Sequence, residues 1–461
     1  MADRDRMPDP ISRRAILASL PIGALAGGLA GGGVSAALYG TRATGFGASP
    51  PPVSSTAVSG TAGPPRFDAT EHGVVGDGVT DNADALNQLI TSVPEGHDIV
   101  FPAGEYRIGD RLRLRSGVNL VGAGSAVTTI RLIDGSDTTF LLMSGESGVR
   151  ISGLTLDGGS QSLDEVALQI DSCTDVVVED CAFVRMSHAV HIYATGLATS
   201  SRVIVRNNHF SSIVDFAVRV GEGANSVLIE NNTVTDVKKM KAPSPAAFYV
   251  RGNDISVVGN VVDASEDSGV LVAGAETRNV SVVGNTLRTT LVCIYYGTGA
   301  TEGTIVGNTV ESDRDFGIHL FDREGSSMKT VVAENHIVSS GKSGVQVEGV
   351  SDLVISANMI IDPGTRDDQK ASWRCGIALT ATNGGPASEF IIVGNVIASD
   401  SSSSRMEHAV LVAVGSKNVR IAANVIRGAR ASAVKLERDL IPPYYVETDE
   451  DILTSFTIRK Q

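Results

Sequence analysis

The feature that most constrains the fold is a repeat that runs through most of the chain. Each copy contains the pattern apolar-x-apolar-x-x-Asn-x-apolar, and its asparagine slot recurs at intervals of 23 to 37 residues. The slot is held by Leu154, Cys181, Asn208, Asn232, Asn260, Asn285, Asn308, Asn335, Asn358, Asn395 and Asn424. A coil of this length is too small to bury a core by itself, so successive coils must stack and share one.

A second pattern, small-apolar-x-apolar, lies between successive copies of the first, as in Gly317-Ile318-His319-Leu320. Such alternation is typical of strands with one row of side chains inward and the next outward. Asparagine suits a fixed slot because it tolerates the left-handed conformation at a sharp turn and because stacked amides hydrogen-bond from coil to coil. These patterns predict an all-β fold, a right-handed single-stranded parallel β-helix.

Composition and charge narrow the function. Aromatic residues make up only 5% of the chain and 50 residues are glycine, which suits short strands joined by tight turns. The formal net charge of −14 disfavours nucleic acid and anionic membrane surfaces as partners. An anionic sugar chain would need a local basic patch or a bound cation.

The N-terminus predicts an export signal. Arg13 and Arg14 precede a weakly apolar run rich in glycine and alanine, which resembles a twin-arginine signal and implies the twin-arginine translocase as a transient partner. The alternative is a membrane anchor, which the many glycines and Pro21 disfavour. We therefore expect residues 1–40 to be a signal peptide, 41–65 a disordered Ser/Pro/Gly-rich linker, and the protein to be exported, without stable membrane insertion after cleavage.

A family resemblance begins where the linker ends. Gly76-Asp77-Gly78 forms a predicted turn before a short amphipathic helix within Asn82–Ser92, and Phe101-Pro102-Ala103-Gly104 follows. This series resembles the N-terminal cap of the pectate-lyase-like superfamily of β-helix proteins. The resemblance implies a capping helix and first coils over 66–125, a β-helix domain over 66–440, and a C-terminal cap or tail over 441–461.

The same resemblance implies action on a polysaccharide but not a particular reaction. The superfamily includes pectate lyases, polygalacturonase-like hydrolases and phage tailspike depolymerases, which spread several chemistries over one scaffold. The Gly-His-Gly of polygalacturonases and the Asp-Pro-His-Asp of alginate epimerases are absent from this chain. A uronate-polymer lyase or a glycoside hydrolase is expected, and the alternative is a non-catalytic glycan-binding or structural solenoid of the cell envelope.

The four cysteines, Cys173, Cys181, Cys293 and Cys375, lack any metal-binding spacing. They are predicted to be buried thiols, with a Cys173–Cys181 bridge as the alternative in an oxidising compartment. No cofactor is predicted. Scattered carboxylates could bind calcium, but the sequence contains no dense cluster of oxygen ligands.

Equal offsets from the small residue of the second pattern define rows of side chains about 4.8 Å apart. The +2 row reads Gln169, His191, Arg219, Tyr249, Leu271, Tyr295, His319, Gln346, Ala378, Leu411 and Lys435. The −2 row reads Glu165, Ser187, Asp215, Pro245, Asp267, Leu291, Asp315, Lys342, Arg374, Glu407 and Ala431. The row between them holds only Ala, Gly or Cys. If all three rows face outward, they form a shallow trough with acids along one lip.

This trough is the predicted active site. The candidate catalytic residues are Asp215, Asp267, Asp315, Arg219 and His319. The three carboxylates lie two coils apart in turn, about 9–10 Å, near the upper end of the spacing of an inverting acid/base pair. Arg219 and His319 would instead serve proton transfer in a β-elimination.

Candidate substrate-binding residues are cations that neutralise a uronate and rings that stack on sugars. They are His191, Lys238, Lys239, Lys241, Tyr249, Tyr295 and Trp373. Two structural alternatives stay open: pairs such as Asp215–Arg219 could be ordinary surface charges, and Trp373 could pin its loop to the body. His188 and His191 are expected on opposite faces of one strand, so no zinc site is predicted.

Overall fold

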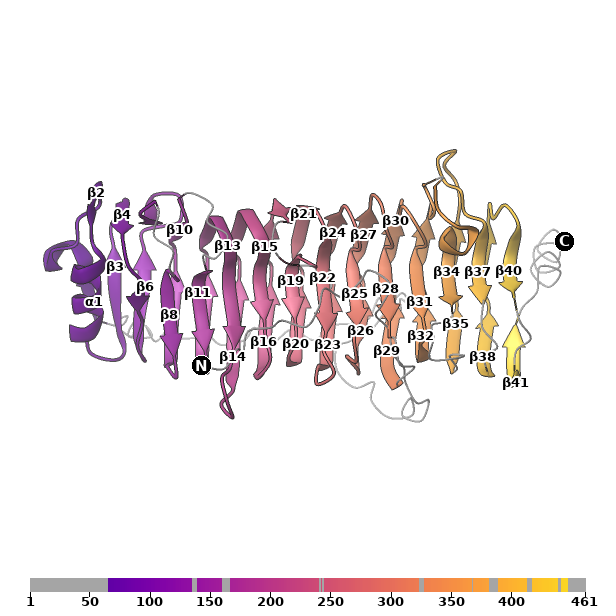
Figure 1. The fold of residues 1–461 in the computed structure, drawn as a ribbon, viewed down its shortest axis with the longest axis horizontal. Helices are drawn as coiled ribbons and strands as arrows, with labels where there is room; N and C mark the ends of the chain where they lie inside the picture. Colours follow the sequence, from indigo (N-terminus) through magenta and orange to yellow (C-terminus); the bar gives the residue numbers. More distant parts are fainter. Residues whose placement is uncertain are drawn as a thin grey trace, which may run out of the picture.

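Parallel strands stack along one long axis, from helix α1 at one end to strand β41 at the other (Figure 1). The computed structural model describes residues 65–134, 139–159, 166–239, 242, 244–322, 327–366, 368–380, 389–412, 417–437 and 441–446. Neighbouring coils pair in parallel throughout these residues, for example β19 with β22 and β25 with β28. The predicted all-β parallel solenoid is confirmed.

Each coil contributes strands to three ladders. The first ladder is a sheet of its own, and it contains β1 (Arg66–Asp68), β3 (His97–Phe101), β6 (Val118–Gly122), β9 (Ser147–Ser152), β12 (Thr174–Glu179), β14 (Ser200–Arg206), β16 (Ala224–Glu230), β20 (Asn253–Val258), β23 (Arg278–Val283), β26 (Thr304–Val306), β29 (Ser327–Ala333), β32 (Ser351–Ser356), β35 (Phe390–Val393), β38 (Lys417–Ala422) and β41 (Ile441–Val446).

The second ladder contains β2 (Asp77–Asp81), β4 (Gly104–Ile108), β7 (Thr128–Leu132), β10 (Thr155–Asp157), the first halves of β13 (Ala182–Tyr193) and β15 (His209–Val220), β17 (Thr233–Val234), β18 (Val237–Lys238), β21 (Val261–Ser265), β24 (Thr286–Thr289), β27 (Thr309–Ser312), β30 (His336–Val338), β33 (Met359–Ile361), β36 (Val396–Ala398) and β39 (Val425–Arg427).

The third ladder carries the rows of interest. It contains β5 (Leu112–Arg113), β8 (Leu141–Ser144), β11 (Val166–Asp171), the second halves of β13 and β15, β19 (Ala246–Val250), β22 (Ser268–Ala273), β25 (Ile294–Gly297), β28 (Ile318–Phe321), β31 (Val345–Glu348), β34 (Cys375–Thr380), β37 (His408–Val412) and β40 (Ser432–Leu436). The long strands β13 and β15 run through both the second and third ladders, which joins them into one sheet.

Stacked asparagine amides hold the coils in register. Asn208 Nδ2 donates to Asn232 Oδ1 over 3.0 Å, and the same bond repeats from coil to coil as far as Asn424. The prediction of an asparagine ladder is confirmed, but its conformational reason is wrong. The left-handed residue is the one before the slot, such as Asn207 at φ 54°, so the ladder asparagine serves hydrogen bonding alone.

Two short helices lie at the N-terminal end of the solenoid. The 3-10 helix η1 (Ala69–His72) and α1 (Ala83–Ser92) precede the third strand, and α1 packs Leu86, Leu89 and Ile90 into the interior. Asp77 Oδ1 accepts the backbone N–H groups of Val79 and Thr80, as expected of the Gly-Asp-Gly turn. The assignment of α1 as a cap stays a prediction.

At the other end, β41 pairs in parallel with β38, so the first ladder continues into the segment predicted as a C-terminal cap or tail. The signal peptide, nearly all of the linker and the end of that tail lie outside the described residues. Among the helices that are described, none is long and apolar enough to span a membrane. The four cysteines are buried free thiols, as predicted, and Cys173 and Cys181 form no bridge.

Candidate functional site

The structure places the +2 row on the outer side of the third ladder. Strand register puts Tyr249, Leu271, Tyr295, His319 and Gln346 opposite one another in five successive coils. The flanking residues, such as Ile294 and Ile318, belong instead to the interior core. We call the outward side of the third ladder from β11 to β34 the outer face.

The row of small residues does not belong to this face, which corrects the predicted trough. Ala217, Ala247 and Cys293 lie in the interior core, and a Cβ on Gly317 would meet Ile337 Cγ2 at 2.6 Å. The chain bends at this corner of the coil, so the small residue and its successor both face inward. Only small side chains fit there. The row that faces outward beside the +2 row is therefore the −1 row, the residues directly before the small ones. It includes Phe216, Ala246, Ser268, Val292 and Phe316.

The same bend overturns the expectation for the two histidines. His188 lies in the −1 row and His191 in the +2 row, so both side chains face outward, and their rings are 6.3 Å apart. Strict alternation failed here because two consecutive residues between them point inward. Among the described residues, no group of three or more His, Cys, Asp or Glu is arranged to hold a metal ion.

An apolar cluster covers the middle of the outer face, separate from the interior core. It contains Ala246, Leu271, Ala273, Val292, Tyr295 and Phe316, with Tyr249 and Trp373 packed against it. Aromatic rings and aliphatic groups together offer the kind of surface on which the apolar faces of sugar rings pack.

Three polar atoms within this surface are buried and form no hydrogen bond of good geometry with the described residues, although the Thr298 hydroxyl lies close enough to Tyr295 to lower its pKa. They are Tyr295 Oη, His319 Nε2 and Gln346 Oε1, from three adjacent coils. Buried polar groups are nearly always paired, so three neighbouring exceptions indicate a place where a ligand supplies the missing partners. Two of these residues, Tyr295 and His319, are candidates from the sequence; Gln346 was not singled out.

The protonation states of this group follow from burial. Burial lowers the pKa of His319 to about 3, with a further contribution from the positive charge of Lys342, so the imidazole is neutral at neutral pH. Burial also raises the pKa of the Tyr295 hydroxyl well above its usual value, which keeps the phenol protonated. A neutral imidazole beside a protonated phenol can accept one proton and donate another.

Two lysine–carboxylate pairs flank these groups. Lys239 Nζ lies 2.9 Å from Asp267 Oδ2, and Lys342 Nζ lies 3.0 Å from Asp315 Oδ1. Burial raises the pKa of Asp315 despite the attraction of Lys342. Lys342 stands one coil from Asp315 in the −2 row, a spacing that could have identified it from the sequence.

Glu348 is a further residue that the sequence did not single out. It lies two residues beyond Gln346 on β31, on the same side of the strand, and Gln346 Nε2 donates to Glu348 Oε1 over 3.2 Å. Burial raises its pKa. Its position two residues beyond Gln346 of the +2 row was the only feature of the sequence that could have indicated a place on the outer face.

Asp215 and Arg219 lie apart from this centre, four coils away from His319. Asp215 is 2% exposed, adopts φ 77° in a bulge of β15, and accepts the backbone N–H of Ala242 over 3.0 Å. Arg219 packs against the rings of Phe216 and Tyr249, with Cζ 5.6 and 5.8 Å from the two centroids. The structure thus does not gather all five candidate catalytic residues in one place.

The candidate binding residues are similarly divided. Lys238, an exposed residue of β18, pairs with Asp236 over 3.2 Å, and Lys241 lies outside the described residues. Trp373 ends the 3-10 helix η2 (Ala371–Trp373) and packs edge-on against Phe316, 6.4 Å between centroids. It therefore anchors its loop to the body, while Lys342 Nζ lies 4.5 Å from its ring centroid.

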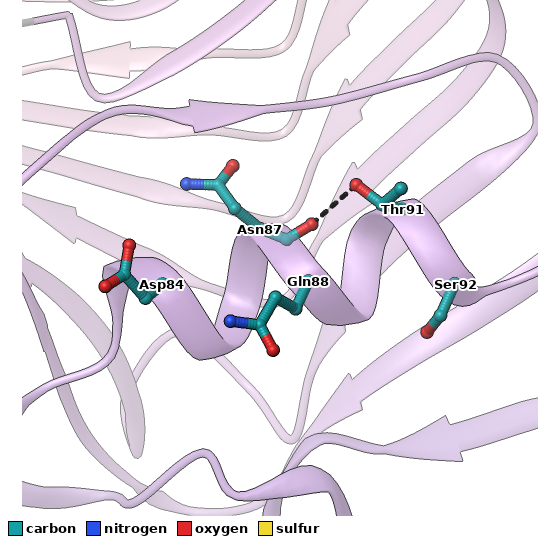
Figure 2. A pocket seen from close by; sticks show the side chains of 5 residues that line it. All are labelled: Asp84, Asn87, Gln88, Thr91 and Ser92. Carbon is teal, nitrogen blue, oxygen red and sulfur yellow. Dashed lines mark hydrogen bonds between the residues drawn. The ribbon is translucent and has the colours of Figure 1, made fainter.

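A surface pocket elsewhere on the molecule lacks comparable chemistry. Figure 2 shows Asp84, Asn87, Gln88, Thr91 and Ser92 along one side of α1, at the N-terminal end of the solenoid. The Thr91 hydroxyl donates to the Asn87 carbonyl, and the Asn87 amide donates to the carbonyl of Arg111. These side chains serve the helix and its attachment, and Asp84 is the sole ionisable group among them.

The fold and the outer face define a class, a parallel β-helix with unpaired polar groups on one ladder. The chain matches the family model described as rhamnogalacturonase A/epimerase, pectate lyase-like, over residues 67–286. It also matches the model described as right handed beta helix region over residues 268–439. The resemblance to pectate-lyase-like β-helix proteins is confirmed at the level of these two matches.

Curated relatives come largely from Azotobacter vinelandii. Mannuronan C5-epimerase AlgE3 is 43% identical over 107 residues, which cover 20% of this chain and 6% of that protein. Mannuronan C5-epimerase AlgE5 is 27% identical over 243 residues, 45% of this chain and 24% of that protein. Alginate lyase 7 is 32% identical over 114 residues, 22% and 13% of the two chains. The matches thus span a quarter or less of these relatives' own length.

Solved structures show the same fold. The A-module of Azotobacter vinelandii mannuronan C-5 epimerase AlgE4 aligns with a TM-score of 0.58 and 20% identity, over 82% of this chain and 99% of the module. A tailspike protein of E. coli bacteriophage HK620, in complex with a pentasaccharide, aligns with a TM-score of 0.61 and 13% identity, over 81% and 78%. At these identities the likeness shows the fold alone.

Proposed function

We propose that this chain acts on an acidic polysaccharide, by proton transfer at the carbon next to a uronate carboxylate. The observation that carries the proposal is the set of unpaired polar atoms on Tyr295, His319 and Gln346, flanked by Lys239 and Lys342. The named activities of the relatives, mannuronan C5-epimerase and alginate lyase, support the substrate class.

The first chemical step needs a base and a sink for negative charge. His319 Nε2 takes the proton from C5 of the uronate, and the electrons of the C5–H bond move into the carboxylate. Lys342 and Lys239, turning from Asp315 and Asp267 to the substrate, stabilise the resulting dianion. The low pKa of His319 makes it a weak base before substrate arrives, but the approaching carboxylate favours its protonated form.

Two outcomes follow from this intermediate. In elimination, the C4–O4 bond breaks, a C4–C5 double bond forms, and the Tyr295 hydroxyl protonates the departing oxygen. In epimerisation, Tyr295 instead returns a proton to C5 from the opposite face and no bond to O4 breaks. Tyr295 and His319 are adjacent rungs of one row, with ring centroids 5.8 Å apart, so both can contact one sugar unit.

The test measures products on a panel of alginates, pectates and neutral glucans. New ultraviolet absorbance indicates elimination, and deuterium uptake at C5 without cleavage indicates epimerisation. We expect His319→Gln and Tyr295→Phe each to lower turnover by about 10²–10⁴-fold. His336→Gln, on the exposed side of β30, is the matched control. Full activity in both variants would refute the proposal.

Hydrolysis is the second candidate, and it rests on Asp267 and Asp315. They lie two coils apart, about 9.6 Å, and burial raises the pKa of Asp315, as a general acid requires. New reducing ends without ultraviolet absorbance, abolished in Asp315→Asn, would favour this reaction. Glycan binding without any product would favour the non-catalytic solenoid.

We also propose export through the twin-arginine pathway. The proposal rests on Arg13-Arg14 and the weakly apolar run that follows them. Replacement of both arginines by lysine should retain the protein in the cytoplasm on cell fractionation. Unchanged export of that variant would refute the pathway.

A further inference from the structure

The outer face contains a second polar group, four coils from the proposed reaction centre. Its central residue is Arg219, at the +2 position of β15. The rungs β15, β19, β22, β25 and β28 separate it from His319 by about 19 Å along the axis, at about 4.8 Å per rung. This group therefore needs its own explanation.

Arg219 is a largely buried cation without a carboxylate partner among the described residues. Its neighbours are two rings, Phe216 and Tyr249, and its Nε is buried without a hydrogen-bond partner. Burial lowers its pKa, and the positive charge of Arg251 adds to this effect. An unpaired buried charge is unfavourable for folding, so its retention points to a task.

The two carboxylates closest to Arg219 in the sequence have other partners. Glu222 Oε1 lies 2.6 Å from Arg251 Nη2, and Asp215 accepts the backbone N–H of Ala242. Gln169, two coils before Arg219, donates to the Tyr193 hydroxyl. Among the described residues of this group, Arg219 Nε has no hydrogen-bond partner.

Two imidazoles lie beside the guanidinium. His191 pairs in register with Arg219, and the ring of His188 lies 5.1 Å from that of Phe216. Burial first, and then the charges of Arg219 and His188, lower the pKa of His191 to about 3. A cation with a neutral N–H donor from His191 and ring walls suits a planar or tetrahedral anion bound at a sugar ring.

We propose that Arg219, with His188 and His191, binds an anionic group of the glycan several sugar units away from the reaction centre. This inference rests on the proposed function and extends that function. The substrate is acidic along its length, and the glycan chain lies along the solenoid axis. Arg219 is then a binding residue, in place of the catalytic role expected from the sequence.

The experiment compares binding of acidic oligosaccharides of two lengths to the full chain, by calorimetry. For an alginate-derived octamer we expect Arg219→Met to weaken affinity about 10- to 100-fold, as for loss of a charge-assisted hydrogen bond. An acidic disaccharide is too short to reach both Arg219 and the reaction centre. Its binding should be lost in His319→Gln, which changes the reaction centre, and retained in Arg219→Met. The control is Arg288→Gln, an exposed arginine paired with Asp263 and Glu311 on the second ladder.

Stability distinguishes binding from a structural role. Arg219→Met should melt at the same temperature as the wild type or higher, because it removes an unpaired buried charge. A lower melting temperature with unchanged octamer affinity would overturn the inference while leaving the proposed function intact. Absence of any acidic glycan binding by the wild type would overturn both. Sulfate stabilisation that depends on Arg219, without octamer binding, would overturn the glycan assignment.

Discussion

The asparagine ladder allows a prediction whose size follows from the hydrogen bonds. Asn308 is fully buried near the middle of the ladder. Its Oδ1 accepts from the backbone N–H and from Nδ2 of Asn285, each over 2.9 Å. Its Nδ2 donates to Asn335 Oδ1 over 2.9 Å and to the carbonyl of Val282 over 2.8 Å. The same Nδ2 also donates to the carbonyl of Val306 over 3.3 Å. The change Asn308→Ala removes all five bonds.

The loss leaves the backbone N–H of Asn285 without its partner and takes one bond from each of several other groups. An unpaired buried donor costs about 1–3 kcal/mol, and we take about 1 kcal/mol for each of the three further lost bonds to Asn285 Nδ2, Asn335 and Val282. The free energy of unfolding should therefore fall by about 4–6 kcal/mol. Asn308→Asp should destabilise further at neutral pH, because a buried carboxylate cannot donate to Asn335 Oδ1.

The assay is urea denaturation followed by far-ultraviolet circular dichroism, with hydrogen exchange at the neighbouring coils. Exchange is needed because a solenoid can open locally, which a single global transition would not report. The control is Asn253→Ala, since the Asn253 amide on β20 accepts one exposed N–H, that of Arg278. If Asn308→Ala destabilised no more than this control, the ladder would not hold the coils together as argued.

Three further outcomes follow from the same structure. Burial lowers the pKa of both His191 and His319 to about 3. Between about pH 6 and 3 the unfolded chain therefore binds more protons than the folded chain. The free energy of unfolding should decrease as the pH is lowered through this range, by about 1.4 kcal/mol per pH unit for each histidine. Burial raises the pKa of Asp352 to about 6, and this shift stabilises the fold as the pH is lowered. The variant Asp352→Asn should therefore make the loss of stability at low pH steeper, as measured by urea denaturation. Adding His319→Gln to that variant should make the loss shallower. Gly317→Ala should lower the melting temperature by crowding Ile337, with a loss of about 1–3 kcal/mol; an unchanged temperature would mean that the corner can relax. Trp373, the single tryptophan of the chain, should change its fluorescence when glycan displaces Lys342 from its ring, and constant emission at saturating glycan would place the ligand elsewhere.

The corner of the coil marks the limit of reasoning from alternation. Period-two counting placed the small residues at Gly269, Cys293 and Gly317 on the same side as Tyr295 and His319. The structure turns them inward, since consecutive residues at a bend can share a side. For the same reason His188 and His191, expected on opposite faces, lie together. Residue spacing alone does not reveal where such a bend lies.

The sequence by itself determined the repeat, the register and the rows. Stacked coils must place equal offsets opposite one another, because parallel strands pair at a fixed spacing and each ladder amide bonds to the asparagine at the same offset in the next coil. That is why the predicted +2 row from Gln169 to Lys435 holds without exception.

Only the tertiary structure decided which members of these rows are buried, paired or left without partners. Asp267 and Asp315 have lysine partners from neighbouring coils, whereas Arg219, Tyr295 and His319 retain unsatisfied atoms. Burial and pairing depend on loops that the repeat does not specify, such as the insertion that brings Trp373 over Phe316. The chemistry of the outer face is therefore a property of these insertions and of the bend, set on a scaffold that the repeat had already fixed.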